Sequence, residues 1–384
     1  MTLTLNESLD DLQLSGIRRI TAKAKQTPGC ILLTLGEPDG NTAEAVKSAV
    51  AASLAENDTH YPPNNGKDFL RAAIARRMAR DGLSYAADEV IVTCGATEAL
   101  FAALTCVMNP GDEIVVPTPA FGLYESIVTL NRGVFVPLDT SESAFQITDE
   151  ALARAASDRT KALVLTSPNN PTGCVYDERS LDAVARFARE RDVFVICDDV
   201  YASLVYDGGS YRRFAQLHSD LRDRIIVCDS FSKPYAMTGW RLGWVAADAA
   251  LVAQMAKIHQ YMVSSVPSFV QRAAARALEQ DISSDRDRYR ARRDYVLERL
   301  AAMGLSAVRP AGAFYVFPSI ARFGMPSEEF CLRLIEEAGV ALVPGSCFSA
   351  EGYVRLSYCC SMEAIEEGLD RLEDFVRKLE GGRS

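Results

Sequence analysis

The sequence has few histidines and lacks the patterns that mark several common kinds of site. It holds three histidines in 384 residues, and no two of its ten cysteines form a C-x-x-C pair. We therefore expect no metal site and no Ser-His-Asp or Cys-His catalytic scheme. Because most of the cysteines lie inside apolar runs, we expect free, mostly buried thiols and a reducing, cytoplasmic location.

Basic excess and long apolar stretches are also missing. The chain has 41 Lys and Arg against 51 Asp and Glu, a formal net charge of −10. This balance argues against nucleic acid and against an anionic membrane surface as partners. No stretch approaches the roughly 18 apolar residues of a membrane span, and the N-terminus carries acids without the apolar core of a secretory signal. A G-x-G-x-x-G fingerprint is absent too, which argues against a nicotinamide dehydrogenase.

Short apolar, β-rich runs alternate with helical stretches between about residues 88 and 247. Nearly continuous apolar strands that alternate with helices indicate an α/β fold with a mainly parallel sheet covered on both faces. The helices are expected over Thr97–Val107 and Glu178–Arg191. Seven strands are expected, over 89–93, 113–117, 134–138, 162–166, 193–197, 225–228 and 242–246.

The C-terminal third has a different character. Long charged helices, such as 284–303, are followed by short strands around 314–317, 340–343 and 354–357 and by helices that end near Leu379. This pattern predicts a second, smaller α+β domain. We expect a large domain over 41–280 and a small domain formed by 1–40 together with 281–384.

Polar, glycine-rich loops follow five of the predicted strands. Ligands of parallel sheets bind beyond the carboxyl ends of the strands, so these loops predict one pocket. The loops are CGATEA (94–99), TPAFGLY (118–124), SPNNPTG (167–173), DDVY (198–201) and SFSKPYAMTGWR (230–241).

Lys233 is the sharpest candidate for chemistry. It follows a buried-type strand and lies among small residues, and a desolvated lysine becomes a nucleophilic amine that can form a Schiff base. Arg241 adds a fixed cation and Ser230 a hydroxyl donor. The turn Gly95-Ala96-Thr97 opens a helix, whose free N–H groups and positive dipole end suit a phosphate. Together these groups predict a monophosphate clamp beside a nucleophilic amine.

Asp198 ends a strand whose preceding residues are all apolar. A carboxylate placed there is costly unless it is paired, so we expect a cationic partner. A lysine amine, a phosphate clamp and a buried carboxylate that keeps a pyridine nitrogen protonated are what pyridoxal 5'-phosphate (PLP) requires of a protein.

From about residue 15 to 379 the chain resembles the class I/II aminotransferases of PLP fold type I. The resemblance is carried by S-F-S-K, M-T-G-W-R, N-N-P-T-G, D-D-V-Y and Y-V-R-L-S-Y at the family's spacing. It implies that Lys233 binds the cofactor, that Ser230 and Arg241 hold the phosphate and that Asp198 pairs with the ring nitrogen. It further implies ping-pong transfer of an amino group from an L-amino acid to a 2-oxo acid.

The same resemblance assigns the remaining site residues. Tyr201 and Asn170 reach the ring oxygen, and Asn170 also contacts the substrate carboxylate. Phe121 stacks on the ring, Arg355 binds the α-carboxylate, and Gly36 lies on the loop that closes over it. Tyr61 resembles a tyrosine that reaches the phosphate of the neighbouring subunit, which implies a homodimer.

Several alternatives stay open. Some aspartate-preferring relatives carry a lysine where Thr97 stands, and a threonine cannot pair with a second carboxylate. The segments S-G-I-R-R-I and G-A-F-Y-V-F-P look most like the N-acetyl-L,L-diaminopimelate aminotransferase subgroup; aspartate and aromatic amino acids are further candidate donors. A cystathionine-type C–S β-lyase would use the same Lys233, Asp198 and Arg355. A ligand-sensing module of a transcription regulator is a remote alternative, since the chain is acidic and the pattern begins by about residue 15.

Overall fold

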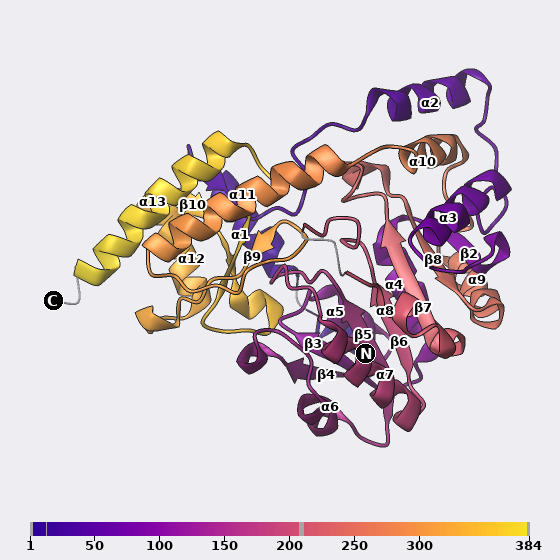
Figure 1. Cartoon of the computed structure of the whole chain (residues 1–384), viewed down its shortest axis with the longest axis horizontal. Coiled ribbons are helices and arrows are strands. Elements are labelled where there is room, and N and C mark those ends of the chain that lie inside the picture. Colours follow the sequence, from indigo (N-terminus) through magenta and orange to yellow (C-terminus); the bar gives the residue numbers. More distant parts are fainter. Residues whose placement is uncertain (1–2, 13, 207–210, 382–384) are drawn as a thin grey trace.

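A seven-stranded sheet forms the centre of the larger part of the molecule (Figure 1). The computed structural model describes residues 3–12, 14–206 and 211–381. The strands lie in the order β2-β8-β7-β6-β5-β3-β4, and β8 runs antiparallel to both of its neighbours, whereas the other pairs are parallel. Their bounds are Val90–Thr93 (β2), Glu113–Thr118 (β3), Val134–Asp139 (β4), Thr160–Thr166 (β5), Phe194–Asp198 (β6), Ile225–Ser230 (β7) and Gly243–Ala247 (β8).

Helices cover both faces of this sheet. One face packs on α4 (Gly95–Val107), α5 (Leu123–Leu130) and α9 (Ala249–Val263), through a cluster that includes Ile91, Val116 and Ile196. The other face packs on α3 (Asp68–Arg80), α6 (Asp149–Ala155) and α7 (Glu178–Arg191). Because each face of the sheet packs against one of these clusters, the side chains that point to either face of the central strands are apolar.

The helix bounds follow from local chemistry. The Asp177 side chain accepts a hydrogen bond from the backbone N–H of Ser180 at 2.8 Å, which caps the first turn of α7. The C-terminal end of another helix, α12 (Ser327–Ala338), is set by Gly339, which adopts φ +65°, a left-handed conformation that ends helices. Three further helices of the larger part are α2 (Glu44–Ala55), α8 (Phe214–Leu217) and α10 (Gln271–Ala277).

The smaller part combines two small sheets with long helices. Strands β11 (Val343–Pro344), β12 (Val354–Ser357) and β9 (Tyr315–Val316) form an antiparallel sheet, while β1 (Ile31–Leu32) pairs in parallel with β10 (Val340–Ala341). The helices are α1 (Gly16–Lys25), α11 (Ser283–Ala302), α12 and α13 (Met362–Gly381). Chain segments from both ends of the sequence therefore build this part.

The predicted α/β class with a mainly parallel sheet is confirmed, and each of the seven predicted strands is present within two residues of its expected bounds. The prediction of one strand over 340–343 is wrong, because its halves pair with different sheets. In the described part of the chain, none of the helices is both long and apolar enough to cross a membrane.

Candidate active site

One cavity of about 330 Å³ opens at the carboxyl ends of the central strands and extends to the smaller part. All the predicted site residues line it except two. Those that line it are Gly36, Ala96, Thr97, Phe121, Asn170, Asp198, Tyr201, Ser230, Lys233, Arg241 and Arg355. Gly95 is not part of the lining but lies next to Arg241, which is, and Tyr61 is 93% exposed and is not part of the lining either.

Lys233 follows β7 and is partly buried in this cavity. Its Nζ donates a hydrogen bond to the carbonyl oxygen of Gly36 at 2.6 Å. Burial, which disfavours the charged form, lowers the pKa of Lys233 to about 8. A lysine with this pKa is about half unprotonated near pH 8, so its amine is available as a nucleophile or a base.

Asp198 ends β6 and is 4% exposed. The Tyr124 hydroxyl donates to Asp198 Oδ2 at 2.6 Å and lies 2.7 Å from the Thr166 hydroxyl, and the Val200 N–H donates to Asp198 Oδ1 at 3.4 Å. Burial raises the pKa of Asp198 to about 6, and the Tyr124 hydrogen bond opposes this rise. The cationic partner expected from the sequence is thus not among the described residues that hydrogen-bond to Asp198.

Arg355 of β12 is 2% exposed, yet it has no carboxylate within ion-pair distance among the described residues. It donates from Nη1 to Asn170 Oδ1 at 2.8 Å and from Nη2 to the Thr34 carbonyl at 2.5 Å. Its Nε is buried without a hydrogen-bond partner. A buried guanidinium with a free donor and no counter-charge is an anion-binding group, because its charge is otherwise uncompensated.

The β2–α4 turn and the start of β8 approach each other closely at the far end of the cavity. Gly95 adopts φ +76°, and a methyl group there would come within 2.5 Å of Arg241 Nη2. The first N–H groups of α4 have no intrahelical partners, so this end combines free amide donors with a guanidinium and the Ser230 hydroxyl, which lies 2.9 Å from Ser232 Oγ. Such a set of donors suits a dianion.

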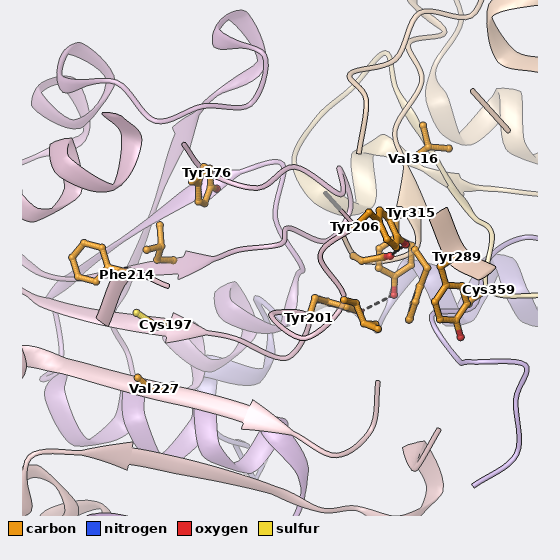
Figure 2. Packing of buried hydrophobic residues seen from close by; sticks show 14 of the residues in the cluster. Tyr176, Cys197, Tyr201, Tyr206, Phe214, Val227, Tyr289, Tyr315, Val316 and Cys359 are labelled. Atoms are coloured by element: carbon orange, nitrogen blue, oxygen red, sulfur yellow. Dashed lines mark hydrogen bonds between the residues drawn. The ribbon is translucent and has the colours of Figure 1, made fainter. Parts of the chain in front are cut away.

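Two tyrosines join the two parts of the molecule across the cavity. Figure 2 shows Tyr201, from the larger part, and Tyr315, from β9, with their hydroxyl oxygens joined by a hydrogen bond of 2.8 Å. Tyr315 also stacks beneath Arg355, whose guanidinium carbon lies 4.4 Å from the ring centre. Gly36 permits this arrangement, since a methyl group there would overlap the Tyr315 hydroxyl at 1.8 Å.

Sequence reasoning missed Tyr124, Thr166, Ser232 and Tyr315 as site residues. Tyr124, Ser232 and Tyr315 lay inside segments already singled out, TPAFGLY, SFSKPYAM and GAFYVF, but nothing in the local pattern showed which side chain faces the pocket. Thr166 ends a predicted strand, and threonine is a common strand residue, so the sequence gives no sign that its hydroxyl belongs to a site. In the described part of the chain, histidine, cysteine and acidic side chains do not gather in any group of three that could hold a metal.

Comparison with known proteins gives consistent matches over nearly the whole chain. The family model for aminotransferase class I and II matches residues 28–372. A probable N-acetyl-LL-diaminopimelate aminotransferase of Bacillus subtilis is 42% identical, over 97% of this chain and 96% of its own length. An aspartate aminotransferase of Pyrococcus abyssi is 38% identical, over 98% of this chain and 99% of its own. The solved aspartate aminotransferase from Thermus thermophilus with maleate has a TM-score of 0.91 and 36% identity, covering 97% of this chain and 100% of its own. The chain therefore belongs to the class I and II aminotransferases and is an aminotransferase.

Proposed function

We propose that this aminotransferase uses PLP held by Lys233 and moves an amino group from an L-amino acid to a 2-oxo acid in a ping-pong sequence. The observation that carries the proposal is the cavity itself. It places a lysine amine, a buried carboxylate and an arginine without a counter-charge around one space. This arrangement fits a cofactor with an aldehyde and a basic ring nitrogen, next to a substrate carboxylate.

The residues present fit each end of PLP. Ala96, Thr97, Ser230 and Arg241 offer donors to the phosphate, with Gly95 leaving room for the guanidinium. Asp198 lies in the same cavity, and a protonated ring nitrogen would supply the cation that the carboxylate lacks in the protein alone. Phe121 lines the cavity as a half-buried ring that suits stacking on a pyridine.

The mechanism follows from what these side chains can do. PLP supplies, when bound, an electron sink for the negative charge that develops at the substrate Cα. Asp198, which lines the cavity, would hold a proton on the ring nitrogen and so keep that sink effective. Arg355 and Asn170 bind and orient the α-carboxylate, and Tyr201 donates to the ring oxygen. The Lys233 amine would accept the proton that leaves the substrate Cα, because its lowered pKa of about 8 makes the neutral amine available as a base.

The range of donors is proposed from the relatives. Their names include N-acetyl-LL-diaminopimelate, aspartate and aromatic-amino-acid aminotransferases, at identities of 42%, 38% and 37%. We include all three donor types in the proposal.

The site lies between the proposed large domain (41–280), which provides Lys233, and the proposed small domain (1–40 with 281–384), which provides Arg355.

A homodimer is part of the same proposal. Tyr61 is 93% exposed, and Tyr261 at the end of α9 is 88% exposed. The segment that carries Tyr61 is fixed on α9, since His259 Nε2 donates to the Asn64 carbonyl at 2.8 Å. Large apolar rings held rigidly at the surface are typical of an interface, and Tyr61 would there reach the partner's phosphate site.

We also propose a cytoplasmic location, on the basis of the many buried, unreactive thiols.

Absorbance spectroscopy tests the proposal. The purified protein, supplied with PLP, is expected to show a visible absorption band that disappears as particular L-amino acids are added and returns with 2-oxo acids. Lys233→Ala is expected to fold but to lose multi-turnover transamination. A protein that stays colourless with PLP, or a Lys233→Ala variant that keeps most of its activity, would contradict the proposal.

A further inference from the structure

The first turn of α1 forms part of the cavity wall, although the proposed mechanism assigns it no role. Ser15, Ile17 and Arg18 all line the cavity that contains Lys233 and Arg355. This turn belongs to S-G-I-R-R-I (15–20), a segment in which none of the residues has a proposed role. The cavity therefore has a cation at its rim whose purpose is open.

Arg18 differs from its neighbours on the helix in having no counter-charge. Arg19 Nη1 lies 2.7 Å from Glu328, and Lys23 Nζ lies 3.2 Å from Glu336. Within the described ranges, Arg18 has no carboxylate at ion-pair distance and its side chain is exposed. Ordinary pairing across the helix surface thus explains Arg19 and Lys23 but not Arg18.

Arg18 is the one charged residue of the cavity lining to which the proposed function assigns no partner. The charged residues that line it are Arg18, Asp198, Lys233, Arg241 and Arg355. In the proposed function, Arg241 binds a phosphate and Arg355 binds an α-carboxylate. Asp198 pairs with a ring cation, and Lys233 binds the cofactor. Only Arg18 then lacks an anion.

The start of α1 adds a second positive feature at the same place. Ser15, the N-cap residue, makes no side-chain hydrogen bond to the helix, so the first N–H groups of this ten-residue helix are not capped by it. The positive end of the helix dipole therefore lies at the cavity rim together with the Arg18 guanidinium. Ile17, Leu35 and Phe121 line the wall as well, which suits the methylene groups of a short chain.

We propose that Arg18, assisted by the first turn of α1, receives the distal carboxylate of a dicarboxylic substrate, an amino or 2-oxo acid of four or five carbons. This inference rests on the proposed function, in which Arg355 binds the α-carboxylate. Thr97 also lines the cavity but contributes no charge. Because the Arg18 side chain is exposed, it can turn outward and leave an apolar wall for an uncharged side chain.

The test compares two donors of equal length in the half-reaction, followed by absorbance. In Arg18→Gln, kcat/KM for L-glutamate is expected to fall by roughly 10- to 100-fold, the usual range for a lost charge-assisted contact, while kcat/KM for L-norvaline stays within about 3-fold. Arg18→Lys should recover part of the loss. Arg19→Gln is the matched control, because Arg19 is the next residue, carries the same charge and does not line the cavity.

Calorimetry of the holoenzyme gives a readout that is independent of turnover. The wild type is expected to bind glutarate more tightly than pentanoate, and Arg18→Gln should abolish this difference. An equal loss for glutamate and norvaline, or an unchanged preference for glutamate, overturns the role of Arg18. A wild type that converts norvaline but not glutamate also overturns it and leaves the proposed function standing. A wild type that converts neither donor leaves the proposed function to the absorbance test with other L-amino acids, and the glutarate titration then decides the role of Arg18 alone.

Discussion

The Lys233 amine lies in a site that favours its neutral form. Burial lowers its pKa to about 8, and the nearby Arg355 charge acts in the same direction. Below pH 8 the amine is mostly protonated and cannot attack an aldehyde. We therefore expect the rate at which the apoenzyme captures PLP to rise with pH, with a midpoint near 8, and to level off about one unit above it. Stopped-flow absorbance over pH 6 to about 10 measures this profile; a midpoint near the ordinary lysine value of about 10.4 would contradict it.

The hydrogen bond from Tyr124 to Asp198 opposes the effect of burial on the carboxylate. In Tyr124→Phe that bond is lost, so the pKa of Asp198 should rise further above about 6 and less of it is ionised near neutral pH. We expect PLP affinity near pH 7 to fall by roughly 10-fold, as for a lost hydrogen bond to a charged group, and to recover as the pH rises.

Fluorescence titration of the apoenzyme with PLP measures this effect. The control is Tyr176→Phe, which changes another buried tyrosine that does not line the cavity. A defect in Tyr124→Phe that is independent of pH would show that the tyrosine acts through packing and not through the ionisation of Asp198.

Sequence reasoning found some residues of the cavity and missed others for a physical reason. Lys233 and Asp198 are each anomalous in their own segment, since an amine or a carboxylate directly follows a buried strand. Tyr124 and Tyr315 are ordinary aromatic residues in apolar surroundings, and only the contact with Asp198 or Tyr201, at separations of 74 and 114 residues, gives them a role. Such contacts depend on the packing of the whole chain.

The turn between β2 and α4 depends on a glycine for two separate reasons. Gly95 has φ +76°, and its missing side chain leaves room for Arg241. Gly95→Ala should therefore displace the guanidinium from the proposed phosphate site and weaken PLP binding by roughly 10-fold or more, while the backbone strain alone costs about 1 kcal/mol of stability.

Gly111→Ala separates these two effects. Gly111 has φ +87°, but no atom lies within 4 Å of the position that a methyl group would take. Thermal unfolding should show a similar loss of stability in both variants, and only Gly95→Ala should show weaker PLP binding in a titration of the apoenzyme. Equal PLP affinity in the two variants would mean that Arg241 does not hold the phosphate.

Whole elements were easier to predict in the large sheet than in the smaller part. Strands such as β5 and β6 are buried on both faces, so their continuous apolar runs stand out against the charged helices. In the smaller part the strands β1, β9, β10 and β11 have only two residues each, which is too short for a pattern. The strand expected over 340–343 shows why this prediction fails. A single apolar run contributes one short strand to each of two sheets, and the sequence does not show which partners they pair with.

The exposed aromatic residues lie on one side of the molecule as a whole. Figure 1 shows α2, α3, α9 and α10 gathered at one end, far from α12 and α13. Tyr61 precedes α3 and Tyr261 lies on α9, and both are more than 80% exposed. If this end is the dimer interface, each Tyr61 serves the site of the other subunit, so the activity of one site depends on two chains.

Mixed dimers test this dependence directly. Lys233→Ala should be inactive, and Tyr61→Ala should bind PLP too weakly for activity at a PLP concentration that saturates the wild type. In a refolded equimolar mixture half of the dimers are hybrids, and each hybrid has one site with an intact Lys233 and an intact Tyr61 from the partner. We therefore expect activity of about a quarter of the wild-type level, since one site in four is complete. If Tyr61 served its own subunit, every hybrid site would lack either the lysine or the tyrosine, and mixing would add nothing to the activity of the separate variants.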